Sequence, residues 1–72
     1  MVDFKKVRED SQEVEYPFGF PTMHRRLVIQ KDSQQGRPAD GRDDLLYRKA
    51  VTKIVLTHRD KREWPDLGGY AA

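Results

Sequence analysis

The sequence predicts an α+β fold in which a small three-stranded antiparallel sheet packs against one C-terminal helix. Residues 42–59 carry the longest apolar pattern with helical spacing. Three earlier segments, at about 2–8, 12–18 and 24–31, are rich in β-branched and aromatic residues. Strands followed by a helix are typical of α+β domains. We therefore expect a single domain over residues 1–63 and a flexible C-terminal tail over residues 64–72.

The predicted helix is the element around which the rest is arranged. Its apolar face repeats at three- and four-residue spacing and consists of Tyr47, Ala50, Val51, Ile54, Val55 and His58. Asp40 is a candidate N-cap, and Asp43 lies three residues later in a variant of the capping box. The β-branched run at 51–57 also fits a buried strand, so that alternative stays open. Leu45 and Leu56 lie off the apolar face, and we expect another segment or a partner to cover them.

The strand at 12–18 shows the clearest alternation of apolar and polar residues. It contains Pro17, which cannot donate a ladder hydrogen bond, so we expect an edge strand or a strand that ends beside this residue. Residues 18–21 are then expected to form an aromatic loop. The strand at 24–31 has an apolar centre and is expected to be more buried. Residues 32–41 are mostly polar, with glycine and proline, and predict the loop that leads to the helix.

The composition restricts the class of protein. The chain has 72 residues and no cysteine, which excludes disulfides and cysteine-based zinc sites. No hydrophobic run approaches the roughly 18–20 residues of a membrane span. Charged residues make up 36% of the chain but nearly cancel, leaving a net charge of +2. This charge is much weaker than the basic face of a dedicated nucleic-acid-binding protein. We expect a cytoplasmic protein without a membrane segment.

No motif predicts catalysis or cofactor binding. His24 and His58 belong to no H-x-x-x-H or H-E-x-x-H spacing. Ser11 and Ser33 lie in polar turns, where serine is common for its hydrogen bonds to the backbone. A chain this short also has little interior in which to enclose a substrate. We expect no enzymatic activity, no metal and no cofactor.

Aromatic residues beside glycine and proline predict a protein-binding surface. Aromatic and arginine side chains dominate the binding free energy of protein interfaces. An open sheet edge can also accept a strand from a partner. The leading hypothesis is a small non-enzymatic regulatory protein, an inhibitor or adaptor, which binds a larger protein and blocks or redirects it. The predicted contact residues are Phe18, Phe20, Arg25, Arg26 and Trp64.

The basic residues support nucleic-acid binding as the alternative. If they share one side of the molecule, they can contact the phosphates of DNA or RNA. The residues concerned are Arg25, Arg26, Lys49, Lys53, Arg59, Lys61 and Arg62. Several basic residues are followed directly by an acidic one, which lowers the local potential that phosphate binding requires. A homodimer that covers Leu45 and Leu56 is a third hypothesis.

Overall fold

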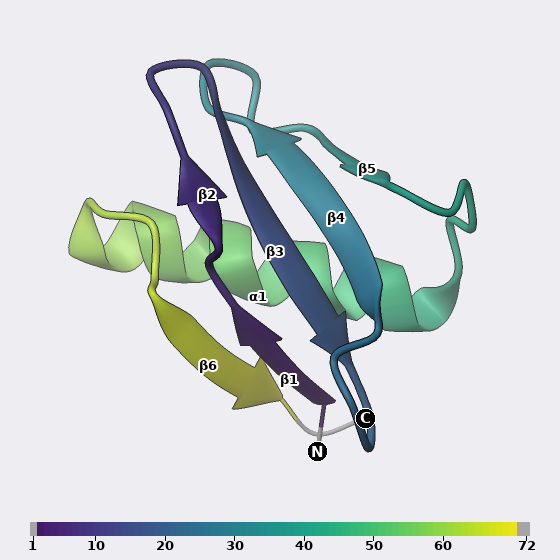
Figure 1. The fold of residues 1–72 in the computed structure, drawn as a ribbon. Coiled ribbons are helices and arrows are strands. Elements are labelled where there is room, and N and C mark those ends of the chain that lie inside the picture. Colours follow the sequence, from purple (N-terminus) through teal and green to yellow (C-terminus); the bar gives the residue numbers. More distant parts are fainter. Residues whose placement is uncertain (1, 71–72) are drawn as a thin grey trace.

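The computed structural model describes residues 2–70, which form an antiparallel sheet and one α-helix that covers a single face of it (Figure 1). In chain order the elements are β1 (Val2–Lys5), β2 (Arg8–Glu9), β3 (Glu13–Gly19), β4 (Arg25–Gln30), β5 (Gly36–Pro38), α1 (Leu45–Lys61) and β6 (Leu67–Tyr70). The strand order is β5-β4-β3-β1-β6, and β2 also pairs with β3. The α+β prediction is confirmed. The prediction of a three-stranded sheet is wrong, because the sheet has six strands.

The first predicted strand is divided into two strands by a bulge. β1 pairs Phe4 with Phe18 of β3, whereas β2 pairs Arg8 with Glu15. Residues 5–7 therefore lie opposite only two residues of β3, which is the one-residue excess of a β-bulge. Bulges bend a strand and increase its twist, so β1 and β2 follow the same neighbour in different directions.

Pro17 lies in the interior of β3, which is a central strand between β4 and the β1 side of the sheet. The Val7 N–H donates to the Glu15 carbonyl at 3.1 Å, so Glu15 directs its backbone groups toward β1 and β2. The backbone nitrogen and carbonyl of Pro17, two residues later, point to the same side. Its missing N–H thus points at the bulge and removes no hydrogen bond to β4. For this reason the prediction of an edge strand, or of a strand end at Pro17, is wrong.

Two strands arise from segments that have no strand pattern. β5 forms within the predicted loop at 32–41 and pairs with β4. β6 forms within the predicted tail and pairs with β1, from Val2↔Tyr70 to Lys5↔Leu67. Each provides partners for main-chain groups that would otherwise be unpaired at a sheet edge. The tail prediction is therefore wrong for residues 67–70, and residues 71–72 lie outside the described residues.

α1 confirms the predicted helix and excludes the strand alternative for its second half. The N-cap is Asp44 rather than the predicted Asp40, because the Asp44 carboxylate accepts a hydrogen bond from the Tyr47 N–H at 3.0 Å. The helix is followed by Arg62 in the left-handed conformation, with φ 63°. The Arg62 N–H donates to the His58 carbonyl at 2.8 Å and closes the helix end.

The core lies between α1 and the sheet face that it covers. It consists of Phe4, Val14, Tyr16, Phe18, Leu27, Ile29, Tyr47, Ala50, Ile54, Val55 and Trp64. The Tyr16 ring meets the Phe4 ring edge to face at 5.7 Å, and its hydroxyl donates to the Pro65 carbonyl at 2.6 Å. Trp64 stacks on His58 with 3.9 Å between ring centroids. These contacts attach the segment after α1 to both layers.

Candidate protein-binding surface

A groove lies between α1 and β6, and exposed apolar residues of both elements line it. Leu56 is 55% exposed and Leu67 is 71% exposed, and both line this groove of about 450 Å³. A Cβ atom at Gly68 would lie 2.7 Å from the Phe4 Cζ, so glycine is needed where β6 crosses the Phe4 ring. Leu45 is also exposed, but it does not line the groove. The lining residues are Phe4, Lys53, Leu56, Thr57, Asp60, Lys61, Pro65, Leu67, Gly68 and Gly69.

One wall of this α1–β6 groove is a strand edge that has no partner strand within residues 2–70. β6 is the outermost strand and is drawn below the C-terminal half of α1 in Figure 1. The Lys6 N–H donates to the Asp66 carbonyl at 2.7 Å, so Asp66 and, two residues on, Gly68 direct their backbone groups toward β1. Backbone directions alternate along a strand, so Leu67 and Gly69 direct theirs away from the sheet. The groove therefore offers main-chain donors and acceptors beside apolar side chains.

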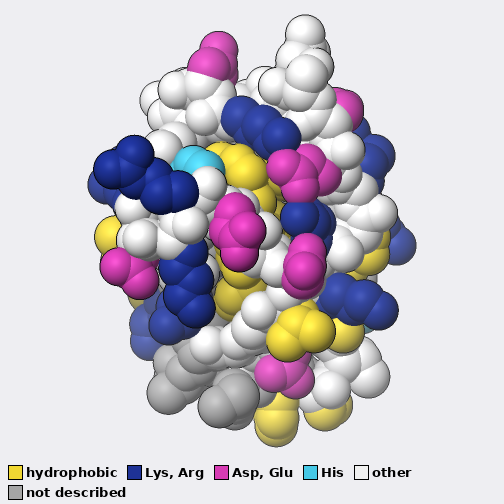
Figure 2. All heavy atoms as spheres, turned by 90° about the vertical axis from the view of Figure 1, so that its left-hand side faces the viewer, with side chains coloured by type: hydrophobic (Ala, Val, Ile, Leu, Met, Phe, Trp, Pro, Cys, Tyr) yellow, Lys and Arg dark blue, Asp and Glu magenta, His cyan; other side chains and the backbone are white. Residues whose placement is uncertain are grey.

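The helix side of the groove is basic. Lys53 and Lys61 line it, and within residues 2–70 neither makes an ion pair. Asp60 lines the groove as well and carries one opposing charge. α1 as a whole holds five basic residues and one acidic residue, a net charge of +4. Figure 2 looks onto this side of the molecule and shows Lys and Arg side chains gathered on the helix side, with apolar side chains set between basic and acidic ones. Such a surface favours a partner with carboxylates next to apolar groups.

The opposite face of the sheet is also charged, but its charges are paired. Arg8 contacts Asp10, Glu13 and Glu15 at 2.9, 2.6 and 3.1 Å. Arg26 contacts Glu15 at 2.9 Å. The hydrogen bond from Arg8 lowers the pKa of Glu13, and those from Arg26 and then Arg8 lower the pKa of Glu15. Because these charges compensate one another, this face offers a partner little net potential.

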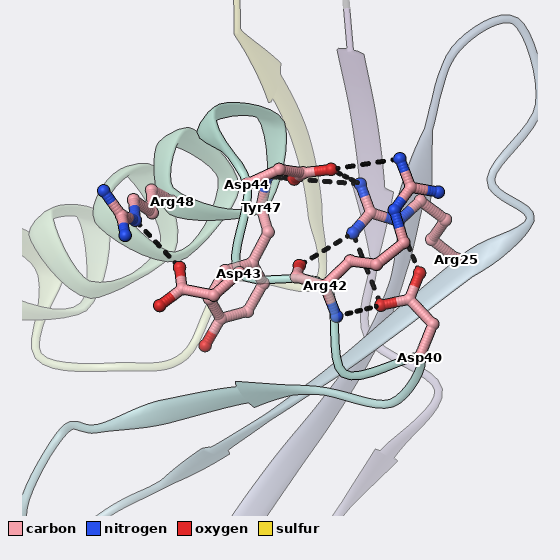
Figure 3. Close-up of polar contacts among 7 residues, drawn as sticks. All are labelled: Arg25, Asp40, Arg42, Asp43, Asp44, Tyr47 and Arg48. Atoms are coloured by element: carbon pink, nitrogen blue, oxygen red, sulfur yellow. Dashed lines mark hydrogen bonds and ion pairs between the residues drawn. The ribbon is translucent and has the colours of Figure 1, made fainter.

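Arg25, a predicted contact residue, is instead an internal structural residue (Figure 3). Its side chain is 6% exposed, and its Nε and Nη1 atoms donate to Asp40 at 2.9 Å and Asp44 at 3.1 Å. Its Nη2 atom donates to the Arg42 carbonyl at 3.1 Å. The guanidinium lies 4.8 Å from the centroid of the Phe18 ring. Its hydrogen bond lowers the pKa of the Asp40 carboxyl. The network attaches the loop before α1, and the helix N-terminus, to β4.

The five predicted protein-binding residues do not form one surface. Phe18 is 0% exposed and Trp64 is 7% exposed, so both belong to the core. Phe18 and Arg25 are in contact, but inside the fold. Phe20 is 62% exposed in the connection between β3 and β4, and Arg26 is exposed on the far face of the sheet. Of this set, only Phe20 and Arg26 offer a side chain to a partner.

The predicted nucleic-acid-binding residues divide between β4 and the α1 region. Arg25 and Arg26 are in β4, with the contacts described above. Arg59 donates to the Gln34 side chain at 2.8 Å. The remaining four are exposed and make no ion pair with any described residue: Lys49, Lys53, Lys61 and Arg62.

The histidines do not come together. In residues 2–70, no three His, Asp or Glu side chains are grouped so that they could hold a metal ion. His24 is exposed, with its Nδ1 3.1 Å from the Thr22 carbonyl oxygen. The His58 Nδ1 is buried and has no hydrogen-bond partner among the described residues. No helix in the described part of the chain is long and apolar enough to cross a membrane.

Comparisons with protein-family models, with curated proteins and with solved structures find no match for this chain. The helix half of the α1–β6 groove was marked in the sequence by Leu56, which lies off the apolar stripe. Its strand half was missed, because Leu67 before two glycines has no strand pattern.

Proposed function

We propose that this chain is a non-enzymatic regulatory protein of the cytoplasm that binds a larger protein and blocks or redirects it. The observation that carries the proposal is the α1–β6 groove, where Leu56 and Leu67 are exposed beside an unpaired strand edge. Exposed apolar groups next to open main-chain groups are typical of binding sites. The groove replaces the predicted contact around Phe18, whose side chain is buried.

The size of the molecule supports a surface-blocking role. A standard interface buries roughly 800 Å² on each partner, which is about one sixth of the 4696 Å² surface of this chain. The groove and the adjoining exposed side of α1 are then both needed for a stable complex. A protein that uses so much of its surface in one contact acts by occupying its partner.

The test is affinity capture with chemical cross-linking, using variants of exposed leucines. Leu56→Asp and Leu67→Asp place a carboxylate at the groove, and Leu45→Asp places one at an exposed position of α1 outside it. We expect the wild type and Leu45→Asp to capture the same larger protein and the two groove variants to lose it. Phe20→Ala tests the other exposed aromatic side chain. Loss with Phe20→Ala alone would place the contact at the β3–β4 connection instead.

Nucleic-acid binding is the second candidate, supported by the net charge of +4 on α1. If Lys53 and its neighbours contact phosphates, affinity for generic double-stranded DNA or single-stranded RNA falls steeply as salt rises. Lys53→Glu then weakens binding, whereas Leu56→Asp does so only through its charge. No binding at low salt excludes this candidate. The exposed Leu45 and Leu56 on the same helix favour a protein partner, because a phosphate backbone offers them no apolar contact.

Homodimerisation through α1 is disfavoured by charge. A two-fold contact at Leu45 and Leu56 places two helices of net charge +4 against each other. We expect a monomer mass by light scattering at high protein concentration and moderate salt. A dimer mass that Leu56→Asp abolishes would support the self-association hypothesis.

A further inference from the structure

We infer that the α1–β6 groove binds an extended segment of the partner as an added strand on β6, and that this segment carries acidic residues on either side of an apolar one. This inference rests on the proposed function and names the chemistry of the partner. It depends on three features of the groove: the direction of the backbone groups of β6, the space above Gly68, and the positions of the free lysines.

The main-chain groups of β6 are directed for strand addition. The Asp66 carbonyl accepts a hydrogen bond from the Lys6 N–H, so the backbone groups of Asp66 and Gly68 point toward β1. The backbone N–H and C=O groups of Leu67 and Gly69 therefore point away from the sheet. An extended chain laid along this edge meets these outward donors and acceptors and continues the sheet. A helix in the groove could not satisfy them, because its own backbone groups are already hydrogen-bonded.

The side-chain environment selects an apolar residue at the centre of the segment. Gly68 pairs with Phe4, whose side chain is in the core on the α1 side of the sheet. A partner residue beside Gly68 therefore points into the groove, where Gly68 has no side chain to occupy the space. There it meets the groove walls at Leu56 and Pro65. An apolar side chain of moderate size fits this place.

The lysines select the residues on either side. Lys53 and Lys61 both line the groove and are eight positions apart in α1, which corresponds to about 12 Å along a helix axis. An extended chain covers about 13 Å in four residues. Residues two before and two after the central one point to the same side of the segment, so acidic side chains there reach the two lysines. A second copy of this chain is a poor occupant, because it brings its own basic helix of net charge +4.

The experiment uses the full chain and a synthetic probe, an end-capped heptapeptide of composition Thr-Glu-Thr-Val-Thr-Glu-Thr. A matched peptide carries Lys in place of both Glu. Nuclear magnetic resonance of the labelled protein should show that the Glu peptide shifts the Leu67 and Gly69 amides and slows their hydrogen exchange. We expect the Lys peptide to bind at least about fivefold more weakly, because it loses two ion pairs with the groove lysines, each of modest free energy. Leu56→Asp should abolish binding of the Glu peptide, and Leu45→Asp should leave it within about twofold.

Two N-methylated peptides test the strand mode itself. One carries methyl groups on the main-chain nitrogens of the Glu and Val residues, the other on those of the Thr residues at alternate positions. Strand addition predicts that only one of the two loses binding, and which one tells whether the segment runs parallel or antiparallel to β6. Equal binding by both, or no amide shift with the unmethylated Glu peptide at millimolar concentration, overturns the inference. If either result accompanies capture of a partner that depends on Leu56 and Leu67, the proposed function stands and only the strand mode is lost.

Discussion

Tyr16→Phe is the substitution that most directly tests how the segment after α1 is held. Tyr16 is 0% exposed, and its hydroxyl donates to the Pro65 carbonyl at 2.6 Å. Removing the hydroxyl leaves that carbonyl without its donor, at a cost of about 1–2 kcal/mol for a buried acceptor. Pro65 is only partly buried, so water replaces part of the bond, and we expect the lower end, about 1 kcal/mol. For a domain of this size, that loss lowers the Tm by roughly 4–8 °C.

Tyr47→Phe is the matched control. Tyr47 is also a core tyrosine, 6% exposed, but its hydroxyl makes no hydrogen bond within residues 2–70. We expect its free energy of unfolding to change by less than about 0.5 kcal/mol. Urea unfolding followed by the fluorescence of Trp64, the single tryptophan, compares both variants with the wild type. Equal stability of the two variants would refute the role of the Tyr16 hydroxyl.

The decrease in the free energy of unfolding at high pH provides a second test of Tyr16. Burial raises the pKa of Tyr16 above its ordinary value of 10.0. Above pH 10 the unfolded chain loses this proton while the folded chain keeps it, so the free energy of unfolding decreases as pH rises. Tyr16→Phe removes this ionisation, and the stability of the variant should decline less steeply between pH 10 and 11. Parallel curves for the two proteins would contradict the burial of an un-ionised hydroxyl.

Three further substitutions test other parts of the structure. Arg8 holds the pKa of Glu13 below its ordinary 4.5, so the wild type should lose stability as pH falls below about 4.5. Urea unfolding measured at several pH values should show a shallower loss of stability for Arg8→Gln than for the wild type. An equally steep loss in both proteins would contradict the pairing of Arg8 with Glu13. Gly68→Ala should cost about 1–3 kcal/mol in urea unfolding, because the new Cβ would lie 2.7 Å from the Phe4 Cζ; an unchanged midpoint would mean that β6 does not lie against that ring. His58→Phe should stabilise the chain by about 1 kcal/mol in thermal unfolding, since it removes a buried nitrogen without a partner and keeps the stack on the indole; a lower Tm would show that this nitrogen is hydrogen-bonded.

The helix and the strands β1, β3 and β4 could be predicted because each carries its own periodic pattern. The stripe through Tyr47 and Ile54 is the buried face of α1. β5 and β6 have no such pattern: Gly36 and the Gly68-Gly69 pair lack the apolar alternation of a strand. These strands form because a neighbouring strand presents an open edge, and an edge is a property of the folded sheet rather than of a local segment. Pro17 misled the prediction for a related reason, since the side to which its nitrogen points is set by the register of β3.

The position of Arg25 could not be predicted from its neighbours in the chain. Arginine is usually exposed unless it is paired, and its partners Asp40 and Asp44 lie 15 and 19 residues away. Only the return of the chain to the start of β4 brings these carboxylates to the guanidinium. For the same reason, the sequence pattern indicated only the helix side of the groove, at Leu56. The other side is formed by β6, whose structure depends on pairing with β1.

The place of β1 between β3 and β6 has a consequence for how the protein is made. Val2 pairs with Tyr70, so β1 leaves the ribosome well before β6, the strand that pairs with its outer edge. Contacts between residues so distant in sequence close slowly, because the chain entropy of a long loop must be lost first. Until then Phe4 is not covered by Gly68, and β1 presents an open edge. Completion of the sheet therefore waits until β6 has been synthesised and has left the ribosome, and until then the nascent chain is a target for chaperones or for association with other copies.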